Sequence, residues 1–202
     1  MAARLDEASL AAHGIAVNVI STTFMVPLGI SSAAAVRVGQ ALGRKEVRGA
    51  AVAGWTAMVL SSLFMGASGL VLSVAPRFIV RLYMRDAAVI ACGAVLLRIA
   101  AVFQLFDGLQ VVATGALRGW GDTRTPMLAH LLGYWTVGLP VGYTLCFSMG
   151  WGAPGIWVGL SAALILIGIA LVVAWRRTIR TAAPPSGLPA TLAVPDTTPP
   201  AA

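Results

Sequence analysis

Long apolar segments, separated by short polar or basic turns, dominate the hydrophobic pattern of this chain. The longest run without Asp, Glu, Lys or Arg extends over 51 residues, from Thr125 to Trp175. About 20 residues are enough to cross the hydrocarbon core of a bilayer as a helix, so this run crosses twice. Its turn is the glycine- and proline-containing stretch Gly150–Gly155. The whole pattern predicts about five transmembrane helices, at Leu10–Val36, Gly49–Val74, Val89–Leu117, Pro126–Met149 and Ile156–Trp175.

The composition supports a membrane location. Of the 202 residues, 58% are hydrophobic and 10% are charged, and the mean hydropathy is +0.87. A soluble domain carries roughly a quarter charged residues. We therefore expect an all-α integral membrane protein over residues 1–180, followed by a disordered cytoplasmic tail over residues 181–202, which are rich in Pro, Ala and Thr. Cys92 and Cys146 lie in separate apolar segments, so neither a disulfide framework nor a metal site is expected.

The basic residues are distributed unequally between the two ends of the predicted helices. One side collects nine of them: Arg37, Arg44, Lys45, Arg48, Arg118, Arg124, Arg176, Arg177 and Arg180. The other side has four: Arg4, Arg77, Arg81 and Arg85. Because cytoplasmic loops are enriched in Lys and Arg, we expect an extracytoplasmic N-terminus and a cytoplasmic C-terminus in a bacterial inner membrane. The same bias explains the net charge of +7 without a nucleic-acid partner. A first helix that enters from outside is hard to insert alone, which favours the hypothesis that further helices precede it.

A short basic segment lies between the second and third predicted helices. Arg77, Arg81 and Arg85 recur every fourth residue, with Phe78, Ile79, Leu82 and Tyr83 among them. This spacing predicts one or two amphipathic turns lying in the membrane interface. A binding site for an anionic ligand is the alternative.

The third predicted helix contains a carboxylate far from either end. Asp107 lies ten residues before Leu117, which corresponds to about 15 Å at 1.5 Å per residue, near the middle of a core about 30 Å thick. A carboxylate there is unfavourable unless it is protonated, paired with a cation or hydrated. Arg98 lies nine residues before Asp107, on the opposite face of the helix, so the two cannot pair directly. Its side chain is expected to reach the opposite membrane interface instead. We therefore predict that Asp107 binds a coupling ion, either H⁺ or Na⁺.

Several polar residues lie near this carboxylate in the helical projection. Gln104 and Gln110 stand three residues to either side of Asp107, Thr114 stands seven residues after it, and Phe103 belongs to the same stripe. On the first helix, Asn18 is a second candidate. These residues either line a substrate cavity or bond neighbouring helices together. His13 and His130 are expected near the interfaces as structural residues, with a proton relay as the alternative for His13.

The connection between the third and fourth helices carries a family resemblance. Gly115–Pro126 reads GALRGWGDTRTP and resembles the GxLRGxGDTRTP segment of the multidrug and toxic compound extrusion (MATE) family. We expect a tight loop in which glycines adopt unusual backbone angles and Thr125 caps a helix that restarts at Pro126. Three further segments agree in order and spacing: AAHGIAVN at 11–18, PLGI with VRVGQALGRK between 27 and 45, and FQLFDGLQVV at 103–112.

The resemblance implies a fold, a function and a site. Members of the family have twelve helices in two lobes and exchange inward H⁺ or Na⁺ for outward organic cations. This chain is similar to helices eight to twelve, most of the second lobe, and its partner is then an N-terminal lobe in the same or a separate chain. Asp107 matches the acidic residue of the family's tenth helix. Phe103 stands where some members have a tyrosine that helps to bind the cation, and the acidic partner of the seventh helix lies outside this segment.

Three function hypotheses follow. The first is a secondary antiporter that exports organic cations or drugs, needs no cofactor beyond its coupling ion, and has the lipid bilayer as a further partner. The second is a flippase for lipid-linked or amphiphilic substrates, and the third is an inactive truncated fragment. The sequence contains no HExxH motif and no paired catalytic carboxylates, so we do not expect an enzyme.

Overall fold

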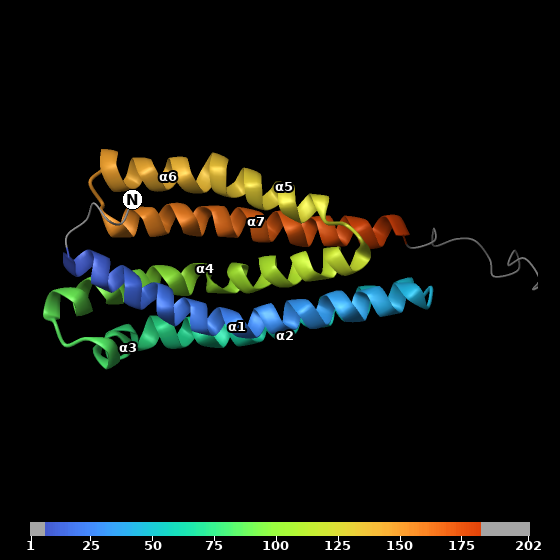
Figure 1. The fold of residues 1–202 in the computed structure, drawn as a ribbon, viewed down its shortest axis with the longest axis horizontal. Coiled ribbons are helices and arrows are strands. Elements are labelled where there is room, and N and C mark those ends of the chain that lie inside the picture. Colours follow the sequence, from blue (N-terminus) through green and yellow to red (C-terminus); the bar gives the residue numbers. More distant parts are fainter. Residues whose placement is uncertain (1–6, 183–202) are drawn as a thin grey trace, which may run out of the picture.

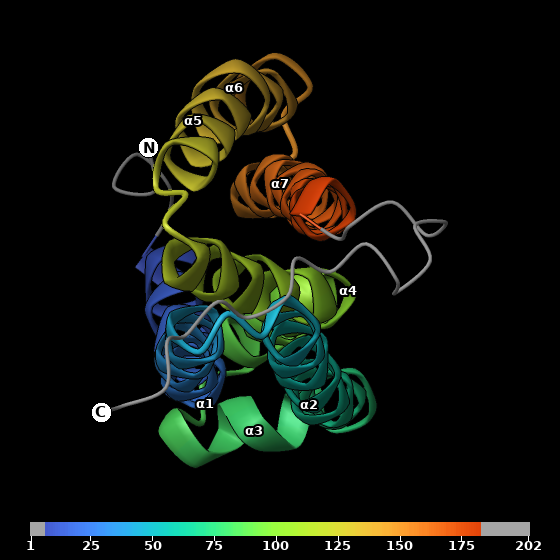
Figure 2. The ribbon, with the colours of Figure 1, turned by 90° about the vertical axis from the view of Figure 1, so that its right-hand side faces the viewer.

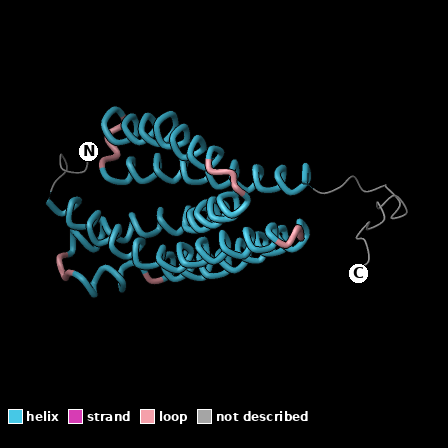
Figure 3. The backbone as a smooth tube through the Cα atoms, turned by 45° about the vertical axis from the view of Figure 1, so that its right-hand side comes forward, coloured by secondary structure: helices cyan, strands magenta, loops and turns pink. Residues whose placement is uncertain are grey.

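A computed structural model describes residues 7–182, which form a bundle of helices (Figure 1). The long helices are α1 (Glu7–Gly43), α2 (Val47–Val74), α4 (Ala87–Trp120) and α7 (Ala153–Ala182), and the short α3 (Pro76–Tyr83) lies between α2 and α4. Before α7 the chain is helical in four consecutive parts, which are α5 (Arg124–Leu132), the π-helical η2 (Gly133–Gly138), α6 (Leu139–Tyr143) and the π-helical η3 (Thr144–Ser148). The prediction of an all-α membrane fold is confirmed, and no strand occurs within residues 7–182 (Figure 3).

Four helices of this described part are long and apolar enough to cross a membrane: α1, α2, α4 and α7. The fifth predicted crossing is helical over residues 124–148, but the two π-helical parts divide it. The helices also extend beyond the predicted ranges. For example, α1 continues past Arg37 to Gly43, and α4 continues past Leu117 to Trp120. A charged side chain ends an apolar run without ending a helix, because its long stem can reach the polar interface while the backbone stays hydrogen-bonded.

The central element of the bundle is α4. Viewed end on, it lies between the pair α1 and α2 on one side and α7 with the α5–α6 segment on the other (Figure 2). Most of its buried apolar residues belong to two clusters, one near Leu96 and Phe103 and one near Leu117. The outer faces of the bundle expose apolar side chains such as Leu63 and Leu70, which are 68% and 64% exposed. Such a surface suits a lipid environment.

Close contact between α1 and α4 depends on two glycines of the GALRG segment. Gly115 and Gly119 are helical residues of α4, and a Cβ atom on either would collide with the α1 backbone at Ser31 or Ala35. Ser31 Oγ donates a hydrogen bond of 2.7 Å to the carbonyl oxygen of Val111 across the same contact. Small residues four apart let membrane helices approach closely. The expectation that the loop glycines serve unusual backbone angles is therefore correct only for Gly121, whose φ is 97°.

The turn after α4 is held by a carboxylate that the sequence analysis did not single out. Helix α5 begins at Arg124, before the predicted start at Pro126, and its N-cap residue is Thr123, whose side chain forms no capping hydrogen bond. Asp122 Oδ1 accepts a hydrogen bond of 3.0 Å from the Thr125 amide. Slight burial raises the pKa of Asp122, but hydrogen bonds from Thr125 and Arg124 outweigh that effect and hold the pKa below its ordinary value.

Candidate functional site

The carboxylate of Asp107 is the buried acidic group of the described bundle, with 7% of the residue exposed. It lies on the side of α4 that faces α1, η2 and α7, and Gln110 Nε2 donates a hydrogen bond of 3.1 Å to its Oδ1. The two residues are three positions apart, so the helix itself brings their side chains together. Within residues 7–182, no group of three or more His, Cys, Asp or Glu side chains is placed to hold a metal ion.

The hydrogen-bonded network continues from Gln110 to another helix. Gln110 Oε1 lies 2.6 Å from His130 Nε2, and His130 Nδ1 lies 2.6 Å from the carbonyl oxygen of Pro126. Both partners of the ring are carbonyl oxygens, which only accept hydrogen bonds. Which of the two ring nitrogens donates depends on the tautomer of the imidazole. The arrangement is a continuous chain from His130 through Gln110 to Asp107.

A cavity of about 380 Å³ opens beside Asp107, between α1, α4, η2 and α7. Aromatic and aliphatic side chains form most of its wall, and Asp107, Gln110, Ser21 and His13 are among its polar groups. The full lining consists of His13, Val17, Ile20, Ser21, Phe24, Met25, Phe103, Asp107, Gln110, Tyr134, Ile156, Trp157, Leu160 and Leu164. An apolar pocket with a few convergent polar groups is the usual form of a small-molecule site.

The aromatic wall of this cavity is fixed by contacts between three helices. Trp157 Nε1 donates a hydrogen bond of 3.1 Å to His13 Nδ1, so that nitrogen of His13 is an acceptor. The indole of Trp157 also packs on Phe103, with 6.1 Å between the ring centroids. These contacts join α7 to α1 and to α4. His13 is thus oriented by Trp157 and contributes to the cavity wall near Asp107.

The residues predicted for the site do not all meet at the cavity. Asp107, Gln110 and Phe103 line it, whereas Gln104 points to the opposite flank and donates hydrogen bonds of 2.8 and 3.2 Å to Thr23 Oγ1 and Ser68 Oγ. Six residues separate Gln104 from Gln110, which places them about 120° apart around the helix. The polar stripe of α4 therefore serves two interfaces.

The two other predicted residues have local roles. Thr114 Oγ1 donates a hydrogen bond of 2.8 Å to the carbonyl oxygen of Gln110, one turn back on α4. Asn18 is exposed, and its Oδ1 accepts a hydrogen bond of 3.0 Å from Tyr83 Oη at the end of α3. Thr114 stabilises the turn that carries Gln110, and Asn18 ties α1 to α3.

Sequence reasoning did not connect Tyr134, Trp157 or His130 with Asp107. Tyr134 is placed by the π-helical part η2, in which the Leu139 amide donates to the Tyr134 carbonyl five residues back, next to Pro140. Pro140 lies in α6, and the wider π-helical turns of η2 and η3 stand on either side of that short helix. π-helical turns often occur at functional sites. Pro140, inside the charge-free run, was the only sequence feature that indicated an irregular helix here. It does not predict which side chain the irregular turns place in the cavity.

The fold and the polar groups within the bundle place this chain among multi-pass membrane proteins. The MatE family model matches residues 1–144, and the chain belongs to this family. The family resemblance seen in the sequence is thereby confirmed.

Curated relatives extend the comparison. The chain is 50% identical over 182 residues to the multidrug resistance protein NorM of Burkholderia vietnamiensis, an alignment that covers 88% of this chain and 39% of that protein. It is 42% identical over 182 residues to the probable multidrug resistance protein NorM of Brucella suis, again covering 88% and 39%. The chain thus spans about two fifths of the length of these relatives.

Solved structures share the arrangement of helices. The crystal structure of the eukaryotic MATE transporter AtDTX14 matches with a TM-score of 0.79 and 21% identity, over 87% of this chain and 40% of that one. The inward-facing conformation of a multidrug resistance MATE family transporter of the MOP superfamily matches with a TM-score of 0.75 and 18% identity, over 83% and 38%. At these identities the likeness shows the fold alone.

Proposed function

We propose that this chain forms most of one lobe of a secondary antiporter that exports organic cations, including drugs, in exchange for H⁺ or Na⁺. The observation that carries this proposal is the buried carboxylate of Asp107 at the wall of a largely aromatic and aliphatic cavity. An apolar wall favours the body of an organic cation, and the carboxylate compensates its charge. The names of the curated relatives, multidrug resistance proteins, favour drug export over the flippase hypothesis.

The exchange requires that Asp107 alternate between two states. As a carboxylate it binds the organic cation in the cavity. When a coupling ion neutralises it, the electrostatic attraction is lost and the organic cation leaves. Because binding of one cation opposes binding of the other at a single carboxylate, the two movements are linked without a second site. The orientation with the C-terminus in the cytoplasm belongs to the same proposal.

The contact of His130 with Gln110 favours H⁺ as the coupling ion. As the side chains stand, the Gln110 amide donates to Asp107 and accepts from His130. A half-turn of that amide reverses both roles, so that it donates to neutral imidazole and accepts from the protonated carboxyl group. The two arrangements hold the same number of protons, and they differ in whether the proton lies on His130 or on Asp107. We infer that Gln110 couples these two positions.

Transport by the complete protein tests the proposed function. The complete transporter, reconstituted in phospholipid vesicles with an acidic interior, is expected to accumulate ethidium as protons leave. A protonophore should abolish this uptake, because it removes the gradient that drives the exchange. Accumulation driven by a Na⁺ gradient, with the same pH on both sides of the membrane, would contradict proton coupling. Uptake at the same rate with and without either gradient would contradict antiport. This chain reconstituted alone tests the hypothesis of an inactive fragment.

Substitution of His130 tests the proton pathway separately. We expect His130→Gln to keep transport measurable but to flatten its dependence on pH, because the amide still donates to Gln110 and does not titrate. His130→Phe should lower the rate further, since it removes the hydrogen bond between the ring and the buried Gln110, whose loss costs about 1–3 kcal/mol. Initial rates of ethidium transport between pH 5.5 and 8.5 provide the measurement. The other titratable groups that share a cavity with this ring, Arg118 and Tyr134, stay in place in both variants. A pH profile unchanged in both variants would remove His130 from the pathway.

A further inference from the structure

A basic cavity lies at the end of the bundle where α1 and α4 begin, distant along α4 from Asp107. Helix α3 runs across this end, at the outer edge of α1 and α2 (Figures 1 and 2). It is fixed on its inner side, because Val80 is fully buried against Gly93 of α4, where an added Cβ would approach Val80 Cγ2 to 2.9 Å. The hydrogen bond from Tyr83 Oη to Asn18 Oδ1 joins its end to α1. The helix is thus held rigidly enough to present a defined outer surface.

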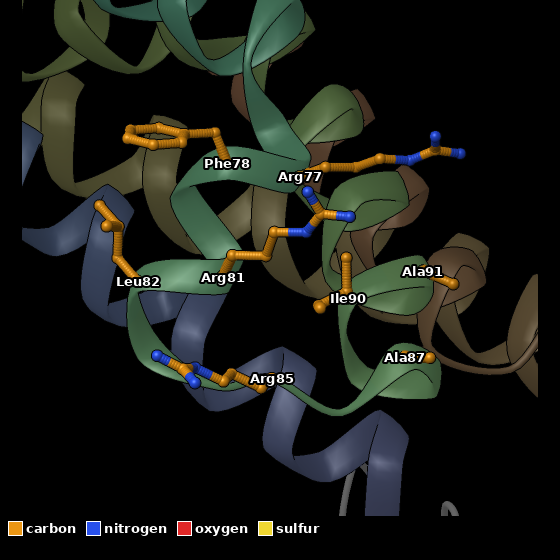
Figure 4. Close-up of a pocket in the computed structure, with 8 residues that line it drawn as sticks. All are labelled: Arg77, Phe78, Arg81, Leu82, Arg85, Ala87, Ile90 and Ala91. Atoms are coloured by element: carbon orange, nitrogen blue, oxygen red, sulfur yellow. The ribbon is translucent and has the colours of Figure 1, made fainter.

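Three arginines line the outer side of α3 and the following turn. Arg77, Arg81 and Arg85 border a cavity of about 700 Å³, with the first turn of α4 opposite them (Figure 4). None of them forms an ion pair with the described residues, in which Arg44–Glu46 is the salt bridge observed. The neighbouring carboxylate of Asp86 is already engaged, because its Oδ1 accepts hydrogen bonds of 2.8 and 3.1 Å from the amides of residues 88 and 89. The three guanidinium groups outnumber this carboxylate, so the cavity keeps a net positive charge.

Apolar side chains flank the same cavity. Phe78 and Leu82 of α3 are 64% and 69% exposed, and Ile90 and Ala91 of α4 complete the wall. In Figure 4 Phe78 and Leu82 extend to one side of α3, Arg77 extends to the other, and Arg81 lies between them. A small soluble anion would use the arginines alone. A molecule with a phosphate group and hydrocarbon chains would use both kinds of side chain.

We propose that this cavity, bordered by Arg77, Arg81 and Arg85, binds the phosphate-bearing headgroup of an anionic phospholipid, whose chains lie against Phe78 and Leu82. Guanidinium groups hydrogen-bond phosphate oxygens in a bidentate manner. An amphipathic helix with basic residues and exposed apolar side chains is typical of a segment lying in the membrane interface. The site is independent of the proposed transport function, because it shares no residue with the cavity at Asp107.

Lipid binding to the purified protein in detergent tests the site. Native mass spectrometry should show tighter binding of phosphatidylglycerol than of phosphatidylethanolamine with the same chains. The triple variant Arg77→Gln/Arg81→Gln/Arg85→Gln should weaken phosphatidylglycerol binding by at least tenfold, because each basic residue near an anionic lipid surface contributes about fivefold. The matched control is Arg176→Gln/Arg177→Gln/Arg180→Gln, which removes the same charge from the other end of the bundle and should change binding by less than about twofold.

Three results of the binding experiment would overturn the proposal. The first is equal binding of the two lipids by the unmodified protein, and the second is an equal loss in the control variant, which would indicate a general charge effect. The third is competition by inorganic phosphate at millimolar concentration, which would indicate a site for a soluble anion.

Hydrogen exchange of the unmodified protein gives a test that needs no variant. Amides of residues 76–86 should exchange more slowly in nanodiscs of phosphatidylethanolamine with phosphatidylglycerol than in phosphatidylethanolamine alone. Unchanged exchange there would show that the segment is covered by another part of the complete protein or by nothing specific to anionic lipid.

Discussion

Asp107→Asn in the complete transporter is expected to abolish export of ethidium while the amount of protein in the membrane stays unchanged. Asparagine has nearly the same shape as aspartate and still hydrogen-bonds Gln110, so the packing of α4 is preserved. It cannot bind a proton or compensate the charge of a cation. The exchange therefore loses the group that couples movement of the organic cation to movement of the coupling ion. Accumulation of ethidium in cells, compared with protein abundance on immunoblots, provides the measurement.

A carboxylate in an exposed position is the matched control for this variant. Glu46 is exposed and forms an ion pair of 3.1 Å with Arg44 in the turn between α1 and α2. Glu46→Gln removes the same charge outside the bundle interior and should leave export unchanged, because exposed ion pairs contribute only about 0–1 kcal/mol. Undiminished efflux in Asp107→Asn would remove this carboxylate from the mechanism. A loss of membrane abundance would instead assign it a structural role.

Gly115→Ala is expected to destabilise the bundle, because the added methyl group would enter the backbone of α1 at Ser31. Inserting a methyl group into a packed interior usually costs about 1–3 kcal/mol, and here the contact involves backbone rather than a movable side chain. For a protein of this size, each kcal/mol lowers the melting temperature by about 2–4 °C. Thermal unfolding of the purified protein in detergent, followed by circular dichroism at 222 nm, provides the measurement.

The control for this substitution is a glycine of α1 that faces open space. A Cβ at Gly29 would have no neighbouring atom within 4 Å. Gly29→Ala should therefore raise stability by about 0.5–1 kcal/mol, since alanine loses less conformational freedom than glycine in a helix. If both variants change the melting temperature in the same direction, close packing of Gly115 on α1 does not determine stability. Opposite shifts would confirm that the GALRG segment is an interhelical contact.

The sequence predicted a structural feature correctly wherever the physical cause of that feature lies within one segment of the chain. The hydrocarbon core excludes charged side chains, so the run from Thr125 to Trp175 could be assigned to the membrane from its composition alone. The same exclusion made Asp107 conspicuous. Gln110 could be predicted as a neighbour of Asp107, because side chains three residues apart on a helix lie close together.

The sequence was less informative where one pattern allows two structural causes. The glycines of GALRG were expected to permit a turn, and in the structure Gly115 and Gly119 permit close approach of α1. Both uses of glycine follow from its missing Cβ, and the choice between them depends on which helix lies beside it. In the same way, the polar stripe of α4 does not reveal that Gln104 bonds α1 and α2 while Gln110 bonds His130.

By itself, the sequence determined that the chain crosses a membrane as a set of helices and that Asp107 is its central buried charge. The tertiary structure alone decided which side chains surround that charge. His130 lies 20 residues from Gln110 along the chain, and Trp157 lies 144 residues from His13, yet each pair is joined by a hydrogen bond. Helical periodicity fixes the direction of each side chain relative to its own axis. The rotation and spacing of one helix against the next depend on the packing of small and large residues across their contact, and this packing completes the cavity.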